Sequence, residues 1–282
     1  MNPLDFDYVA SSTMSGAVQQ YTRLTQAGKQ PMYYGGGTEI ITLGRLHQVN
    51  PNAVIDLKPI PELQVMAVQQ GKLILGGGIT LTQITGQSLL REAFPLLQAT
   101  VHEIADHTAR NKITLAGNIC GQIFYREAIL PFLVCDSMVR TFGPQRAKER
   151  SIHQVFQREA RLEAGEFIAQ FVTDSPTRTA PFVHIKRRKA GQVGYPIVSA
   201  AAIRVSDRIR IALSGVCRFP FRSSALETAL QQGGLTVGQR VQQAIQVIPQ
   251  NLILDDYEAS RAYRTFVLAT VLEEILQRLG GA

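Results

Sequence analysis

Residues 110–121 read Arg-Asn-Lys-Ile-Thr-Leu-Ala-Gly-Asn-Ile-Cys-Gly, and this stretch is the most informative one in the chain. It is filled by small side chains, hydroxyls and amides, with almost no side chain bulky enough to build a core. Glycine lets a backbone approach a ligand closely, and Thr and Asn supply donors and acceptors at short range. A second such loop, residues 33–39, reads Tyr-Tyr-Gly-Gly-Gly-Thr-Glu. Together the two loops predict a cradle for a large phosphorylated cofactor.

The elements around the second loop support this prediction. Residues 31–34 are typical of a short strand that runs into Gly35, and residues 38–46 have the apolar spacing of a helix. A strand, a glycine loop and a helix in this order present backbone N–H groups and a helix N-terminus to a phosphate. The spacing is neither GxGxxG nor a Walker loop. Three glycines alone would suit a plain turn equally well.

The remaining pattern predicts an α+β architecture in two parts. We expect helices over residues 14–28, 82–107 with a break at Phe94-Pro95, 130–138 and 262–279, and strands over 54–57, 72–75, 139–142, 167–172, 197–205 and 209–216. A chain of 282 residues is long for one core. Turn-forming residues over 173–181 predict a linker, so we expect one domain over 1–174, with subdomains of approximately 1–55 and 56–174, and another over 175–282.

Charge and composition narrow the function classes. The net charge is +7, and residues 140–189 hold eleven Lys or Arg against five Asp or Glu. Nucleic-acid binding through the run Lys186–Lys189 is one interpretation, but no aromatic residues interleave with that run, so we expect no nucleic-acid partner. No stretch of about 18 apolar residues predicts a membrane span. Residues 1–5 lack the basic and apolar segments of a secretory signal, which predicts a cytoplasmic protein without a membrane partner.

Side chains that could perform chemistry are scarce. The three cysteines show no metal-binding spacing, the five histidines are scattered, and no GxSxG motif is present. The acidic pairs Asp255-Asp256 and Glu273-Glu274 are interpreted as solvated helix surface rather than as catalysts. We therefore predict no metal site and no catalytic acid or base. Such a profile fits a chain that binds and tunes an organic cofactor, which itself carries the reaction.

Taken in order, the motifs resemble the FAD-binding flavoprotein (medium) subunit of the xanthine dehydrogenase and carbon monoxide dehydrogenase family of molybdenum hydroxylases. The family's first loop reads roughly Ala-Gly-Gly-Thr-Asp, where this chain has residues 35–39. Its second reads Arg-Asn-x-x-Thr-x-Gly-Gly-Asn-Ile, matched by residues 110–119. Residues 76–81 are similar to the strand-end motif between them, and residues 211–227 to a Gly-Gly-Val…Pro…Arg…Glu pattern.

The resemblance covers nearly the whole chain and implies its fold. We expect an α+β protein with an FAD-binding domain of the p-cresol methylhydroxylase type over 1–174. A smaller α+β domain, an antiparallel sheet with helices, would follow over 175–282. The chain departs from the family at Ala116, which stands where the first glycine of a pair is usual, and over residues 122–127.

The resemblance also implies which residues bind FAD. Backbone N–H groups of Gly35–Glu39 would hold the pyrophosphate. Thr114, Gly117 and Asn118 would line the pyrophosphate, the ribityl chain and the flavin edge. Glu127 takes the place of a family aspartate that reaches a ribityl hydroxyl, and His184, with Lys186 as the alternative, that of a lysine near the flavin. The full implied set is Tyr33, Tyr34, Gly35, Gly36, Gly37, Thr38, Glu39, Ala105, Thr114, Gly117, Asn118, Glu127, Ile168, His184 and Lys186.

As a member of this family, the chain would be the FAD-binding electron-transfer subunit of a molybdenum hydroxylase. Its partners would be a large subunit with the molybdenum cofactor and a small 2Fe-2S subunit, and electrons would leave the flavin for NAD+ or another acceptor. Two alternatives stay open. One is a stand-alone flavoprotein oxidoreductase of the same fold, and the other is an FAD-free homologue that serves as an assembly or scaffold protein.

Overall fold

A computed structural model describes residues 5–191 and 193–280, so most of the N-terminal stretch considered for a signal lies outside the described residues. The chain forms two compact units. The first comprises segments 1–86, 107–123 and 137–173, and the second comprises 87–106, 124–136 and 174–282. The expected C-terminal domain, 175–282, thus falls in the second unit together with two earlier segments. The predicted domain boundary at residue 174 stays a prediction, since a compact unit is not by itself a domain.

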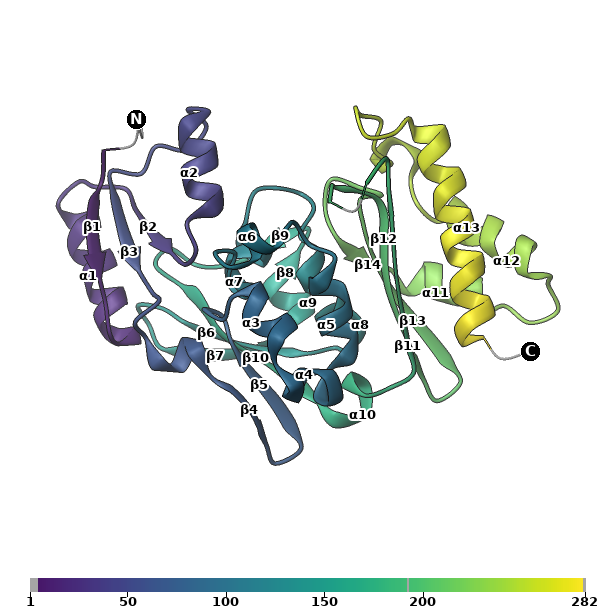
Figure 1. Ribbon diagram of the computed structural model, residues 1–282, viewed down its shortest axis with the longest axis horizontal. Coiled ribbons are helices and arrows are strands. Elements are labelled where there is room, and N and C mark those ends of the chain that lie inside the picture. The colour runs from purple at the N-terminus through teal and green to yellow at the C-terminus, as the bar shows by residue number, and fades with distance from the viewer. Residues whose placement is uncertain (1–4, 192, 281–282) are drawn as a thin grey trace. The chain divides into compact units, whose positions relative to one another are not determined.

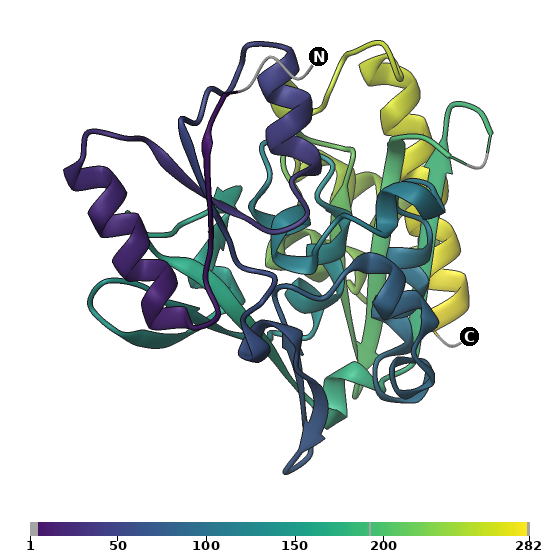
Figure 2. The same cartoon turned by 60° about the vertical axis from the view of Figure 1, so that its left-hand side comes forward.

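The first unit begins with a small parallel sheet. Its strand order is β1-β3-β2, built from β1 (Asp7–Ala10), β2 (Pro31–Tyr34) and β3 (Ala53–Asp56), with α1 (Met14–Gln26) after β1 and α2 (Thr38–Arg45) after β2 (Figure 2). Thr13 caps α1 by accepting the Gly16 N–H. Because parallel strands end at a common edge, the loop after β2 and the residues after β3 lie side by side.

A second sheet completes the first unit. Its strand order is β4-β5-β10-β6-β7, built from β4 (Met66–Gln69), β5 (Lys72–Gly76), β6 (Met138–Phe142), β7 (Ala147–Ser151) and β10 (Phe167–Asp174). Short elements join these strands: η1 (Pro61–Gln64), α3 (Leu81–Gly86), α6 (His107–Arg110), α7 (Leu115–Cys120), α9 (Ile152–Val155), β8 (Phe156–Gln157) and β9 (Glu159–Ala160). An irregularity between Ile168 and Gln170 in β10 leaves the Ala169 carbonyl to accept the Gly77 N–H at 2.8 Å. This bond ties the loop after β5 to the centre of the sheet.

The second unit is an antiparallel sheet with helices on both faces (Figure 1). The strands, in order, are β11 (Phe182–Arg188), β12 (Pro196–Val205), β13 (Arg208–Ser214) and β14 (Phe221–Arg222). One face of the sheet is covered by α4 (Ser88–Ala93), α5 (Pro95–His102) and α8 (Leu130–Val134), with the short elements η2 (Glu127–Ile129) and α10 (Ser175–Arg178) nearby. The other face is covered by α11 (Ser224–Leu230), α12 (Val237–Gln246) and α13 (Arg261–Leu279). The short helix η3 (Gln250–Leu252) precedes α13.

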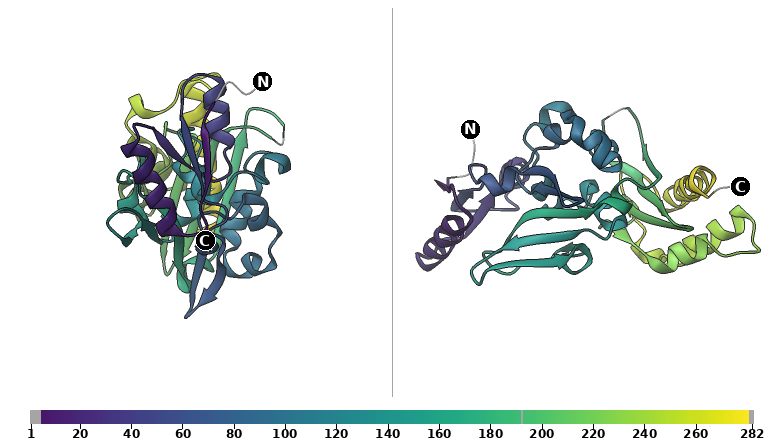
Figure 3. Two further views of the ribbon diagram at one scale, coloured as in Figure 1. Left: turned by 90° about the vertical axis from the view of Figure 1, so that its left-hand side faces the viewer. Right: turned by 90° about the horizontal axis from the view of Figure 1, so that it is seen from below.

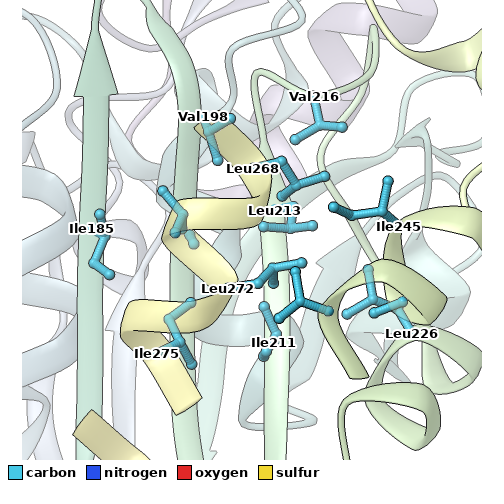
Figure 4. Packing of buried hydrophobic residues seen from close by; sticks show 14 of the residues in the cluster. Ile185, Val198, Ile211, Leu213, Val216, Leu226, Ile245, Leu268, Leu272 and Ile275 are labelled. Atoms are coloured by element: carbon cyan, nitrogen blue, oxygen red, sulfur yellow. The ribbon is translucent and has the colours of Figure 1, made fainter. Parts of the chain in front are cut away.

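Burial explains why β12 is apolar along nearly its whole length. Its residues 196–203 are all buried, because helices cover both sides of the strand. Helix α13 runs along one face of the sheet (Figure 3). Its side chains Leu268, Leu272 and Ile275 pack against the sheet (Figure 4). Arg264 on the same helix is fully buried and donates to the carbonyls of Ile197 and Gly215, each at 2.7 Å. The guanidinium thereby joins α13 to the ends of two strands.

The helices expected over 14–28, 38–46 and 262–279 and the expected strands match observed elements within a few residues, and the α+β class with an antiparallel C-terminal sheet is confirmed. The strands β1, β4, β7 and β11 were not predicted. Two expectations were wrong, and a third was incomplete. The helical region expected over 82–107 has the expected break, since α5 begins at Pro95, where proline suits the first helical turn, but it also breaks between α3 and α4. The helix expected to reach Met138 ends at Val134, and Met138 opens β6. Asp255 and Asp256 are not helical, and Asp256 binds the buried Arg264 at 2.6 Å.

Candidate functional site

The glycine loop, residues 35–39, joins β2 to α2. Gly37 takes a left-handed conformation, φ +71°, which favours glycine, and forms the N-cap of α2. No side chain caps this helix N-terminus. The N–H groups of a first helical turn have no partner within their own helix. The loop therefore offers an uncapped helix N-terminus, which suits an anion such as a phosphate.

Close packing explains why the other two loop positions are glycines. A Cβ atom on Gly36 would lie 1.6 Å from the Lys112 carbonyl oxygen, and one on Gly35 would lie 2.6 Å from Thr114 Oγ1. Both neighbours belong to residues 110–121, so the two loops singled out in the sequence lie directly against each other. Their contact depends on backbone surfaces that only glycine leaves bare.

The second loop is held by its own hydrogen bonds. Thr114 is buried and accepts the Gly117 N–H at 3.2 Å, which caps α7. The N–H groups of Leu115 and Ala116 donate to the carbonyls of Ile79 and Gly77 at 2.8 and 2.9 Å. The N–H groups of these two residues are therefore hydrogen-bonded within the protein and are not available to a ligand. This loop can meet a ligand through its Thr and Asn side chains and through its shape.

Glu39 joins the two loops through its side chain. Its carboxylate accepts the N–H groups of Gln122 and Ile123, the latter at 2.9 Å, across more than 80 residues of sequence. A Cβ on Gly121 would lie 2.0 Å from the same carboxylate, so glycine is needed there too. Sequence reasoning assigned Glu39 through its backbone N–H only. The contribution of its carboxylate emerges from the tertiary structure.

A charged group that the sequence analysis missed lies beside the glycine loop. Lys58 Nζ donates to Asp56 Oδ1 at 2.6 Å and to the Gly35 carbonyl at 3.3 Å, and it lies 4.6 Å from the centre of the Tyr34 ring. Burial alone would raise the pKa of Asp56, but hydrogen bonds from Lys58 and Tyr8 hold that pKa below its usual value. A single Lys after a short strand matches no sequence motif. Its position beside the glycine loop is visible only from the strand order, which places the residues after β3 next to the loop after β2.

Two other predicted residues of the first unit, Tyr33 and Ile168, make contacts within the protein core. The Tyr33 hydroxyl donates to the Gly165 carbonyl at 2.8 Å, and its ring stacks on Tyr21 with centroids 5.3 Å apart. Ile168 is buried in β10, and its carbonyl oxygen would lie 2.7 Å from a Cβ on Gly77. The Tyr33 side chain is thus engaged in the core, and Ile168 lies where β10 meets the loop after β5.

Four predicted residues, Ala105, Glu127, His184 and Lys186, belong to the second unit. Lys186 and Glu127 form a buried ion pair at 2.7 Å, with side chains 2% and 3% exposed. Lys186 also donates to the Glu103 carbonyl at 2.8 Å. Burial raises the pKa of Glu127 and lowers that of Lys186. The family resemblance named Glu127 and Lys186 separately as cofactor-binding residues; their ion pair was not predicted, and their role at the cofactor stays a prediction.

His184 precedes Lys186 by two residues on β11, and Ala105 follows Glu103, whose carbonyl accepts the Lys186 ammonium, by two residues. Burial lowers the pKa of His184 to about 4, so its ring is neutral at neutral pH. Its Nε2 lies 3.5 Å from the Ser199 hydroxyl. Ala105 has φ +50°, an uncommon conformation for a residue with a Cβ. We call Glu103, Glu127, His184, Lys186 and Arg188 the charged cluster of the second unit.

The basic run Lys186–Lys189 is engaged within the second unit. Arg187 pairs with Glu274 at 2.5 Å, Arg188 pairs with Glu103, and Lys189 Nζ lies 3.9 Å from the centre of the Tyr257 ring. These contacts use the charges that a nucleic-acid surface would need to present.

The described residues give no support to a metal site or to a membrane span. Across 5–191 and 193–280, no group of three or more His, Cys, Asp or Glu side chains could hold a metal ion. Cys135 and Cys217 are buried, and Cys120 is exposed. Among the helices that the structure describes, none is long and apolar enough to cross a membrane.

Comparison with known proteins places the chain in a family. The family described as "FAD binding domain in molybdopterin dehydrogenase" matches residues 5–172. The xanthine dehydrogenase FAD-binding subunit of Escherichia coli O157:H7 is 21% identical, covering 95% of this chain and 94% of that protein. The caffeine dehydrogenase subunit beta of Pseudomonas sp. strain CBB1 is 23% identical, over 80% of this chain and 78% of that protein.

Solved structures share the fold along the whole chain. A chain of carbon monoxide dehydrogenase from Hydrogenophaga pseudoflava superposes with a TM-score of 0.87, at 20% identity and 99% coverage of both chains. A chain of quinoline 2-oxidoreductase from Pseudomonas putida 86 gives 0.83, at 18% identity and coverage of 96% and 95%. The matched residues include the glycine loop and the second loop described above. The chain therefore belongs to the family of FAD-binding domains in molybdopterin dehydrogenases, and it is an oxidoreductase subunit whose cofactor is FAD.

Proposed function

We propose that this chain is the FAD-binding electron-transfer subunit of a multi-subunit molybdenum hydroxylase. Electrons would arrive from a 2Fe-2S small subunit, served in turn by a large subunit with the molybdenum cofactor, and would leave for NAD+ or another acceptor. Relatives named as subunits of xanthine and caffeine dehydrogenases support this role. FAD supplies the redox chemistry when bound, and the chain binds it, orients it and controls its surroundings.

The observation that carries the proposal is the uncapped N-terminus of α2 behind the glycine loop. Gly37 is the N-cap residue, and it has no side chain that could accept the first N–H groups of α2, which have no partner within their own helix. We infer that this N-terminus holds the FAD pyrophosphate, whose negative charge the helix dipole and the N–H groups favour. Lys58 adds a positive charge at the same edge.

The other implied residues have roles that fit their chemistry. Thr114 and Asn118 would line the bound cofactor with a hydroxyl and an amide, and Gly117 leaves room between them. For the second unit, we propose that Glu127, His184 and Lys186 act near the cofactor, as the family resemblance implies, with Ala105 packed against it. A neutral His184 would donate or accept a hydrogen bond there without adding charge.

Thr38→Asp tests the phosphate seat. Thr38 is exposed and is the first residue of α2, so an aspartate there fits and favours helix stability through the dipole. The same carboxylate would repel a pyrophosphate a few ångströms away, and we expect FAD affinity to fall roughly ten- to hundredfold. Thr38→Asn, of nearly the same shape without the charge, is the matched control. Both affinities are measured by titrating the apoprotein with FAD and following flavin fluorescence.

The outcomes separate the proposal from its rivals. A stable Thr38→Asp variant with wild-type FAD affinity would place the pyrophosphate elsewhere. Purification of the chain from its native source tests the subunit role, because a flavoprotein of a single chain size would favour the stand-alone enzyme. Absence of flavin absorption in the purified protein would favour an FAD-free scaffold.

A further inference from the structure

Lys58 lies in a position that sets the orientation of one peptide in the glycine loop. Its ammonium donates to the Gly35 carbonyl, which belongs to the peptide between Gly35 and Gly36. In a planar trans peptide the C=O and the next N–H point in opposite directions. With the Gly35 carbonyl held toward Lys58, the Gly36 N–H points away from it.

This orientation matters because a peptide between two glycines turns over readily. Without Cβ atoms, both residues reach backbone conformations closed to other residues. A turned peptide would present a carbonyl oxygen where an N–H is wanted, and a carbonyl repels a phosphate. An anion-binding loop works only while its successive N–H groups face the anion.

The lysine is itself fixed by its surroundings. Asp56 receives both the Lys58 backbone N–H, at 3.0 Å, and the ammonium, at 2.6 Å. The Asp56 carboxylate is buried, and its other oxygen accepts the Tyr8 hydroxyl. Gln64 donates to the Lys58 carbonyl at 3.2 Å. A flexible side chain thereby gains a fixed terminal position beside the loop.

Tyr34 contacts both Lys58 and the glycine loop. Its ring lies under the Lys58 ammonium, and a Cβ on Gly37 would lie 2.1 Å from its hydroxyl. The ring therefore contacts both the cation and the last glycine of the loop. We propose that Lys58, anchored by Asp56, is a positioning residue that holds the Gly35–Gly36 peptide with its N–H available to the pyrophosphate of FAD. The inference rests on the proposed seat of FAD at this loop.

The test compares Lys58→Met with Lys58→Arg in the full chain. The Lys58 side chain is 47% exposed, so neither variant is expected to unfold the protein. Methionine keeps the length and loses the donor, and we expect affinity for FAD and for ADP to fall roughly ten- to hundredfold. Affinity for riboflavin, which has no phosphate, should not change. Arginine restores the donor and most of the affinity. Lys29→Met, the same charge change elsewhere in the first unit, should bind FAD like the wild type.

Salt separates positioning from direct attraction. A charge acting on the phosphates through solvent is largely screened at about 0.5 M NaCl, whereas a misplaced peptide is not. We expect the Lys58→Met deficit to persist at high salt. Loss of the deficit there, or wild-type FAD affinity of Lys58→Met, would overturn the inference. If Thr38→Asp weakens FAD binding while Lys58→Met does not, the inference fails and the phosphate seat stands. If neither variant weakens binding, the seat itself is wrong.

Discussion

The glycine loop of the first unit is built almost entirely from backbone, whereas the charged cluster of the second unit is built from side chains around a buried ion pair, Lys186–Glu127. The loop offers uncharged N–H groups at a helix end, and its glycines let the Lys112 backbone approach. The cluster holds Lys186 and Glu127 out of water, where Lys186 donates to Glu127 Oε2 and to the Glu103 carbonyl. The first arrangement depends on the absence of side chains, and the second depends on particular side chains being present together.

This difference predicts opposite responses to mutation. At the three glycines of the loop, Gly35–Gly37, any added side-chain atom should be harmful, even an uncharged one. In the cluster, removal of one charge should be harmful because its partner is left buried and unpaired. The three experiments below test this contrast, from the largest expected effect to the smallest.

Lys186→Met should give the largest loss of stability. Removing one partner of a buried ion pair leaves the Glu127 carboxylate uncompensated, which costs about 3–5 kcal/mol of unfolding free energy. Arg187→Met on the same strand is the matched control, because the Arg187–Glu274 pair is partly exposed and such pairs contribute about 0–1 kcal/mol. Urea unfolding measures both. Equal losses in the two variants would contradict the distinction between the buried and the exposed pair.

Gly36→Ala should disrupt the loop by a single methyl group. The new Cβ would lie 1.6 Å from the Lys112 carbonyl oxygen, so the two loops must separate. We expect a loss of about 1–3 kcal/mol in unfolding free energy, as for other overpacked sites, together with loss of bound FAD. Gly86→Ala is the control, since a Cβ there meets nothing within 4 Å. Wild-type flavin content in Gly36→Ala would show that loop contact is not required for binding.

The charged cluster should also make stability depend on pH through His184. Its pKa is about 4 in the folded chain because of burial, against about 6.5 unfolded. As pH falls from 6.5 toward 4, His184 binds a proton in the unfolded chain but stays neutral in the folded chain, so the free energy of unfolding decreases. The slope from this residue reaches at most about 1.4 kcal/mol per pH unit.

The groups that face His184 act in both directions. Glu103 raises the pKa of His184, and Lys186 and Arg188 lower it. His184→Gln should flatten the pH dependence between pH 6.5 and 4 in urea unfolding series, with the substitution at the exposed His47 as the matched control. An unchanged slope in His184→Gln would mean that this ring is not the group responsible.

Particular residues show how far the sequence could be read. Gly35–Gly37 and Thr114–Asn118 were recognisable because local spacing, small side chains and a strand-to-helix order are properties of short segments. Glu127 and Lys186 were named only through a family resemblance, and the ion pair between them is visible only in the structure. The structure adds the carboxylate of Glu39 and the ammonium of Lys58, because each acts on residues that are distant in the chain.

The sequence by itself determined several of the helices and strands of this protein, its two glycine-rich loops and, through the order of its motifs, its family and its cofactor. Hydrophobic periodicity and turn residues act within about 20 residues, so they can be read along the chain. Only the tertiary structure decided that Gly36 contacts Lys112, that Lys58 reaches the Gly35 carbonyl, and that the basic run 186–189 is used internally. Those contacts follow from the strand order and from the packing of helices on sheets, which no local pattern specifies.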